Sequence, residues 1–177
     1  MDGYTTIDRT WSDGDVVELV LPMRPRLVRR ERQAVGVRLG PLVLALRIPE
    51  NWTPVPGAPG LAEWEVHPRT SWNFALACAT DTADWPVTRT TPGPVPFGLD
   101  DAPVRIAARG AHVTGWGLDG VQAGTVPQSP VLDAGPRVDI ELIPYGSARL
   151  RITEFPILGA NVGVEFDRHH ETPSNPE

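Results

Sequence analysis

The fold is decided most clearly by residues 137–156, which read RVDIELIPYGSARLRITEFP. Apolar side chains alternate with acids before the sequence Pro144-Tyr145-Gly146 and with arginines after it. A period of two is typical of half-buried strands, and Pro followed by Gly suits a three-residue turn. We therefore predict a β-hairpin. The register that keeps both apolar sets on one face pairs Ile140 with Leu150, Val138 with Ile152, Glu141 with Arg149 and Asp139 with Arg151.

Composition extends the β prediction to the whole chain. The 177 residues include 20 Pro, 17 Gly and six Trp, and 41% of them are hydrophobic. Short apolar runs separated by Pro and Gly, without long helical periods, favour strands joined by turns. A length of 177 residues suits one domain with a sizeable core. We predict an all-β fold, an antiparallel β-sandwich of jelly-roll-like type with long Pro-rich loops, in which residues 1–166 form one domain and 167–177 a polar tail.

Further strands follow from the same alternation and from turn residues. The sequence Asp13-Gly14 is a strong hairpin signal between two alternating runs, and Gly40-Pro41 separates two others. The run LVLAL after Gly40-Pro41 is apolar on both faces, which predicts a central strand. The strands expected are Tyr4–Trp11, Asp15–Leu21, Ala34–Leu39, Pro41–Ile48, Ala62–Pro68, Ser71–Ala79, Val104–Arg109 and His112–Trp116, followed by an extended connection over Leu118–Pro136.

Charge and apolar patterning exclude two classes of partner. The chain has no Lys, a net charge of -6 and a pI of about 5.2, so it carries no electrostatic footprint for nucleic acid. No apolar run approaches membrane-spanning length, and no signal peptide opens the chain. The single Cys78 cannot form an intramolecular disulfide, and its apolar strand makes it a small core residue. These features do not indicate a cellular location for the protein.

Residues 24–32 carry five arginines. Clustered Arg side chains recognise carboxylates, so one interpretation of this stretch is a patch that binds anions or acidic polysaccharides. The alternative is a solvated edge strand, where charge blocks aggregation between strands. We favour the edge strand.

Tryptophans in or near loops are the candidate ligand-binding residues. Their rings could stack on sugars, or they could cover the edge of the core. The candidate carbohydrate-binding residues are Trp52, Trp64, Trp72, Trp85 and Trp116. A second candidate surface is the irregular segment Asp81–Asp101, because loops of this length in compact domains are usually functional or interfacial.

The sequence contains no recognisable catalytic constellation. No pair of acids stands out as the two carboxyl groups of a glycosidase, and Cys78 has no activating partner nearby in the sequence. Zinc-ligand spacing, a phosphate-binding loop and a serine-nucleophile elbow are all missing. Asp167, His169, His170 and Glu171 lie in the polar tail, where a frayed terminus is the better interpretation than a metal site. We expect no catalytic residue, no metal and no cofactor in this chain.

Several motifs together resemble one family. They are LIPYG and LRITEFP in the region of residues 141–156, preceded by Gly3-Tyr4, Ile7, Arg9, Trp11, Gly14-Asp15, Gly40-Pro41-Leu42-Val43, Trp72-Asn73-Phe74-Ala75-Leu76 and Pro127-Gln128-Ser129-Pro130. In this order and spacing the chain resembles the C-terminal β-sandwich region of the beta-L-arabinofuranosidase-like glycoside hydrolases, many of which are still described as domains of unknown function. The resemblance spans nearly the whole chain.

The resemblance implies that the chemistry lies elsewhere. In that family a helical α/α barrel N-terminal to the sandwich carries a Cys nucleophile and a zinc ion held by Cys and Glu, and none of those motifs has a match here. The strands that usually precede the Gly3-Tyr4 motif are also missing, so we expect a sheet edge that invites pairing with another chain.

Three functions remain open from the sequence. The leading hypothesis is a non-catalytic accessory domain that packs on the catalytic barrel, shapes its entrance or mediates dimerisation. The second is a carbohydrate-binding module that uses the tryptophans. The third and weakest is a self-standing glycosidase. The expected partners are therefore the barrel domain of the parent protein, a second copy of the chain, or a carbohydrate.

Overall fold

The computed structural model describes residues 4–57, 63–77 and 85–159. In these ranges the backbone forms antiparallel strands and two three-residue 3-10 turns, so the all-β prediction is confirmed. The strands are β1 (Pro25–Arg29), β2 (Val35–Leu39), β3 (Leu42–Leu46), β4 (Glu50–Pro54), β5 (Trp64–Pro68), β6 (Phe74–Leu76), β7 (Val87–Arg89), β8 (Val104–His112), β9 (Leu118–Asp119), β10 (Gln122–Ala123), β11 (Arg137–Pro144) and β12 (Glu154–Phe155), and the turns are η1 (Glu31–Gln33) and η3 (Tyr145–Ser147). None of the helical segments described is long and apolar enough to span a membrane.

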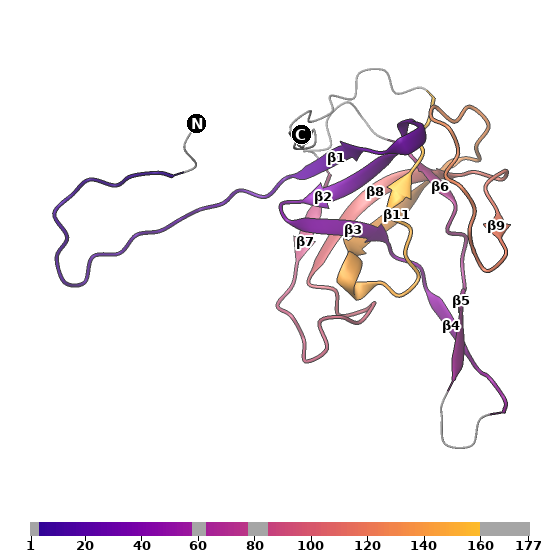
Figure 1. The fold of residues 1–177 in the computed structure, drawn as a ribbon, viewed down its shortest axis with the longest axis horizontal. Helices are drawn as coiled ribbons and strands as arrows, with labels where there is room; N and C mark the ends of the chain where they lie inside the picture. Colours follow the sequence, from indigo (N-terminus) through magenta and orange to yellow (C-terminus); the bar gives the residue numbers. More distant parts are fainter. Residues whose placement is uncertain (1–3, 58–62, 78–84, 160–177) are drawn as a thin grey trace, which may run out of the picture.

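The main sheet has the strand order β1-β2-β3-β11-β8-β6, with β7 beside β8 (Figure 1). The hairpin β2–β3 turns at Gly40-Pro41 as predicted, with Leu39 paired to Leu42. Gly40 has a φ of +56°, a left-handed conformation that glycine adopts without strain. The apolar run in β3 is central, as predicted: Leu44, Ala45 and Leu46 are all buried between β2 and β11.

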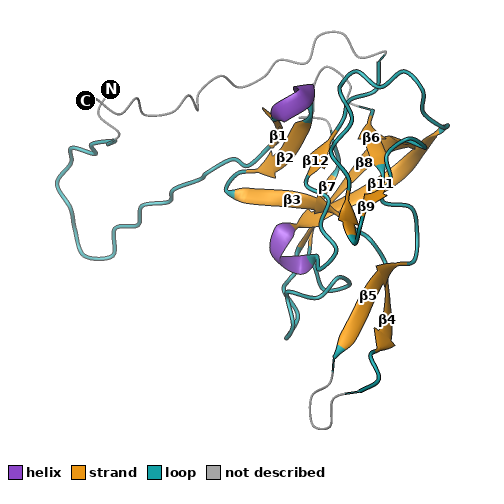
Figure 2. Ribbon diagram, turned by 45° about the vertical axis from the view of Figure 1, so that its right-hand side comes forward, coloured by secondary structure: helices purple, strands orange, loops and turns teal. Residues whose placement is uncertain are grey.

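The sheet curls into a half-barrel, which gives the sandwich-like fold (Figure 2). β12 pairs with β2, and the residues directly after it pair with β6. The Leu76 amide donates to the Pro156 carbonyl at 2.8 Å, and the Leu158 amide donates to the Leu76 carbonyl at 3.1 Å. The segment that begins at Glu154 therefore joins the β2 side of the sheet to the β6 side.

The core fills the inside of this curl. Val35, Val37 and Leu39 of β2 meet residues of β3, β8, β11 and β12 there, and the fully buried Phe155 is the largest of them. A smaller apolar cluster lies on the outer face of β3 and β11. It consists of Ala45, Ala102, Ile143 and Ala148, with Leu99 packed against it.

The hairpin predicted over residues 137–156 is wrong in its pairing. β11 lies between β3 and β8, with Ile140 opposite Ala108 and Ile143 opposite Ala45. β8 pairs with one edge of β11 along Arg137–Leu142, and β3 pairs with the other along Leu142–Pro144, directly before the turn. The segment after η3 therefore cannot fold back on β11 at the turn. That segment turns at the predicted place but continues to β2, where β12 pairs with Gly36 and Val35.

The break predicted between two strands at Gly110 is also wrong. Val104–Arg109 and His112–Trp116 were expected as separate strands, yet β8 runs without interruption through Gly110. A Cβ at Gly110 would lie 3.0 Å from the Ala75 carbonyl oxygen and 3.0 Å from Ile140 Cδ1. Gly110 therefore allows β6 and β11 to approach closely and does not break the strand.

Loops and termini differ in smaller ways. Asp81–Asp101 contains the short strand β7, Leu118–Pro136 contains the hairpin β9–β10, and Ser71–Ala79 forms only the three-residue β6 in its described part. The Arg-rich stretch contributes β1, which ends the strand order. Cys78 and the predicted tail 167–177 lie outside the described residues.

The N-terminal arm, residues 4–24, extends away from the sheet (Figures 1 and 2). The predicted turn is present: the Asp15 amide donates to the Ser12 carbonyl at 3.1 Å, and the Ser12 amide donates to Asp15 Oδ2 at 2.7 Å. The predicted strands Tyr4–Trp11 and Asp15–Leu21 are not formed. Two strands without a third, or without a core to cover, are only marginally stable, which explains the open arm.

Candidate binding surface

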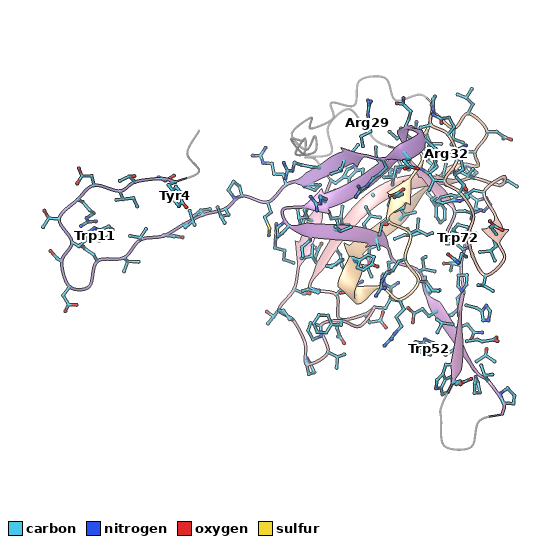
Figure 3. All side chains as sticks on the ribbon, in the orientation of Figure 1. Tyr4, Trp11, Arg29, Arg32, Trp52 and Trp72 are labelled. Carbon is cyan, nitrogen blue, oxygen red and sulfur yellow. The ribbon has the colours of Figure 1, made fainter. Side chains whose placement is uncertain are left out.

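The hairpin β4–β5 projects from the sheet and carries two exposed tryptophans. Its register pairs Trp52 with Val66 and Pro54 with Trp64, so both tryptophans lie on one face. The opposite face carries Asn51, Thr53, Glu65 and His67. Trp52 is 42% exposed and Trp64 is 51% exposed. Figure 3 shows Trp52 on this projecting hairpin, well away from Trp72.

The two rings form a corner and not a flat platform. Their centroids are 6.3 Å apart and their planes are inclined at 71°. Trp52 Nε1 donates to Glu50 Oε2 at 3.0 Å, which fixes the edge of that ring. Edge-to-face contact is a favoured arrangement of aromatic rings, so the corner is stabilised before any ligand arrives.

Arg149 connects this hairpin to the segment that follows η3. Its guanidinium carbon lies 5.0 Å from the centroid of the Trp52 ring, within the range of a cation–π contact. The contact holds the guanidinium at a defined place although Arg149 is exposed. The sequence placed Arg149 opposite Glu141; in the structure Glu141 instead pairs with Arg105 and Arg47.

A second arginine repeats this arrangement two residues later. The guanidinium carbon of Arg151 lies 4.3 Å from the centroid of the Tyr145 ring, and its Nε donates to the Ala148 carbonyl at 2.7 Å. Tyr145 lines a shallow hollow of about 370 Å³, together with Leu42 and Val43 of β3. We call Trp64, Trp52, Arg149, Arg151 and Tyr145 the aromatic–arginine strip.

The other predicted tryptophans serve the core. Trp116 is 2% exposed, and its Nε1 donates to the Gly124 carbonyl at 2.9 Å. Trp72 packs edge-to-face on Trp116, with centroids 5.3 Å apart, and Trp85 packs against the core. The buried Trp116 therefore presents no ring face to a ligand. Of the five candidates, the structure brings Trp52 and Trp64 together on an exposed surface.

The sequence did not identify Arg149, Arg151 or Tyr145 as candidate site residues. Both arginines had been assigned to cross-strand pairs in the predicted hairpin, and no local pattern links Arg149 to a tryptophan so distant in the chain. The repeat of an arginine over an aromatic ring emerges only from the tertiary fold.

The described ranges contain no group of three or more His, Cys, Asp or Glu side chains that could hold a metal ion. The tail residues Asp167, His169, His170 and Glu171 lie outside those ranges. Comparisons of the chain with protein-family models, with curated proteins and with solved structures found no match.

Proposed function

We propose that this chain is a non-catalytic β module that docks on another folded domain through its N-terminal arm. The observation that carries the proposal is the exposure of apolar side chains along the arm. Tyr4 is 92% exposed and Leu19 is 77% exposed. Contiguous exposed apolar surface usually marks an interaction site. The large apolar side chains exposed on the arm are Tyr4, Ile7, Trp11, Val16, Val17, Leu19, Val20, Leu21 and Met23.

The second limb of the arm, residues 15–21, has the pattern of a strand with one apolar face. In an extended conformation Val17, Leu19 and Leu21 face one side, while Val16, Glu18 and Val20 face the other. Strands of this kind normally cover a core with their apolar face. The turn at residues 12–15 is already formed, so the chain already reverses its direction there. Docking on a sheet edge therefore requires residues 4–11 and 15–21 to come together as paired strands.

The resemblance to beta-L-arabinofuranosidase-like glycoside hydrolases supports a specific partner, the helical α/α-barrel catalytic domain of such an enzyme. In this proposal the barrel carries out hydrolysis, and the present chain stabilises it or shapes its entrance. A second copy of the chain is the competing occupant of the arm.

Co-expression with such a barrel domain tests the proposal. We expect a one-to-one complex in size-exclusion chromatography with light scattering, and we expect Leu19→Asp to weaken it at least tenfold because a carboxylate would be buried. Val121→Asp is the matched control, since Val121 is 95% exposed but lies in the β9–β10 turn. Failure to form a complex, or a complex equally tolerant of both substitutions, rejects the proposal.

Carbohydrate binding is a second candidate function, favoured by the exposed Trp52–Trp64 corner. Apolar faces of sugar rings pack on indole rings, and hydroxyl groups of a sugar can bond to nearby polar groups such as Glu50. Tryptophan fluorescence during titration with neutral and acidic plant oligosaccharides tests this function. A saturable change that Trp64→Ala removes supports it; an unchanged spectrum with every sugar counts against it.

A further inference from the structure

We propose that the aromatic–arginine strip binds an acidic sugar chain, with uronate carboxylates on Arg149 and Arg151 and a sugar ring in the Trp52–Trp64 corner. The inference rests on the carbohydrate-binding function proposed above and specifies its ligand. The strip combines two kinds of recognition, the exposed rings of Trp52 and Trp64 and two guanidinium groups that are each held over an aromatic ring.

The arginines of the strip have donors to spare for a carboxylate. In the described part of the chain, neither Arg149 nor Arg151 pairs with a carboxylate, whereas Arg105 and Arg47 both pair with Glu141. A guanidinium group has five N–H donors in a planar fork that fits a carboxylate in bidentate fashion. Among the residues that the structure describes, the interaction of Arg149 is its cation–π contact with Trp52, which leaves the N–H fork to bind a carboxylate.

Both guanidinium groups are positioned in advance. Arg149 lies over Trp52, while Arg151 lies over Tyr145 and is bonded to the Ala148 carbonyl. Side chains that are already held in place lose less conformational entropy on binding. Two such cations offer two places for a carboxylate, and a ligand with repeated carboxylates can use both.

The charges beside the strip are of both signs. Arg149 and Arg151 supply positive charge, in a chain whose net charge is -6. Glu50 is the acid on the Trp52 face of the hairpin, and it accepts a hydrogen bond from Trp52. Glu65 lies on the opposite face, where it contacts His67 at 3.2 Å.

The Arg-rich stretch at residues 24–32 is a weaker candidate for the same ligand. Arg30 pairs with Glu154 at 3.6 Å, and Arg26 and Arg29 have interactions of their own. No exposed pair of aromatic rings accompanies these arginines in the described residues. The strip therefore fits an acidic sugar better than the stretch that the sequence suggested.

The test is calorimetric titration of the full chain with trigalacturonic acid, its methyl ester and neutral galactotriose. We expect the acid to bind at least tenfold more tightly than the ester, because charge-assisted bonds are the stronger ones. The double variant Arg149→Gln with Arg151→Gln should remove this preference for the acid. Trp64→Ala should lower the affinity for the acid and for the methyl ester about tenfold each. All these side chains are exposed, so the variants should unfold at the same denaturant concentration as the parent.

Two control variants isolate the strip. Arg109→Gln removes an exposed arginine that pairs with Asp139 at 3.4 Å, and Trp11→Ala removes an exposed arm tryptophan that lies beneath Arg9. Neither should change the affinity for trigalacturonic acid.

The possible results separate the two proposals. Equal binding of acid and ester that depends on Trp64 overturns the acidic ligand and retains carbohydrate binding. No binding of any of the three sugars overturns the acidic ligand, and the fluorescence titration with the other oligosaccharides then decides the carbohydrate-binding function separately. Binding of the acid that survives the Arg149 and Arg151 substitutions overturns the strip as its site.

Discussion

Two tryptophan pairs in this molecule have nearly the same ring geometry and opposite surroundings. Trp72 and Trp116 meet at 5.3 Å and 75°, and Trp52 and Trp64 meet at 6.3 Å and 71°. The first pair lies against the core, and the second on a hairpin that projects from the sheet. Ring geometry alone therefore does not distinguish an architectural pair from a binding surface.

The hydrogen-bond partners make the distinction. The indole N–H of Trp116 meets a backbone carbonyl, and Asn73 donates to the carbonyls of Val113 and Trp116 beside it. The indole N–H of Trp52 meets the Glu50 side chain, with an exposed arginine over the ring. The buried pair is fixed by bonds to backbone carbonyls, whereas the exposed pair is fixed by side chains that water can also contact.

The largest expected effect comes from truncating the buried pair. Trp116→Ala should lower the free energy of unfolding by about 3–5 kcal/mol, because it leaves a cavity and an unpaired carbonyl at Gly124. Trp64→Ala should lower it by less than about 1 kcal/mol. Urea unfolding followed by circular dichroism measures both. Similar losses for the two variants would end the distinction between the pairs.

An intermediate effect is expected at the asparagine that supports the buried pair. Asn73→Ala should cost about 1–3 kcal/mol, since it leaves the Trp116 carbonyl without its donor, while the Val113 carbonyl keeps only the bond from the Trp116 amide. Asn51→Ala, on the exposed polar face of β4, is the matched control and should be neutral within about 0.5 kcal/mol. The same urea experiment compares them, and a neutral Asn73→Ala would show that the pair does not need this support.

The smallest effect is expected at Glu50. Glu50→Ala removes the acceptor of Trp52 Nε1, which solvent can replace, so the free energy of unfolding should change by less than about 0.5 kcal/mol. Acrylamide quenching of tryptophan fluorescence provides a second reading, because a Trp52 ring released from its carboxylate should become more accessible. A loss above 1 kcal/mol would show that the exposed pair is part of the folded framework.

Local signals predicted local structure well. The turns at Gly40 and at Ser12–Asp15 and the buried strand Leu42–Leu46 follow from turn residues and from apolar periodicity over a few positions. The hairpin at residues 137–156 had equally strong local signals, yet β11 pairs with β3 and β8. Alternation specifies that a segment is a strand and which face it buries, but not which edge it meets.

The candidate site was predictable only in part. The exposed pair Trp52 and Trp64 belonged to the predicted set, whereas the contact of Arg149 with Trp52 joins segments that are far apart in the sequence. The opposite charges of Glu141 and Arg149 suggested an ion pair between them, but in the structure Glu141 pairs with Arg105. Burial separates the exposed tryptophans Trp52 and Trp64 from the architectural ones, and burial is a property of the whole fold.

We propose that the curled sheet folds by itself and that the arm is held available for a partner. The direct test is the free energy of unfolding of the full chain compared with a variant lacking residues 4–21, which retains Met23 beside Gly40. We predict equal values within about 0.5 kcal/mol, because the arm contributes exposed side chains and no strand pairing to the sheet. A loss of more than about 2 kcal/mol would show that the arm belongs to the fold, which would contradict its proposed docking role.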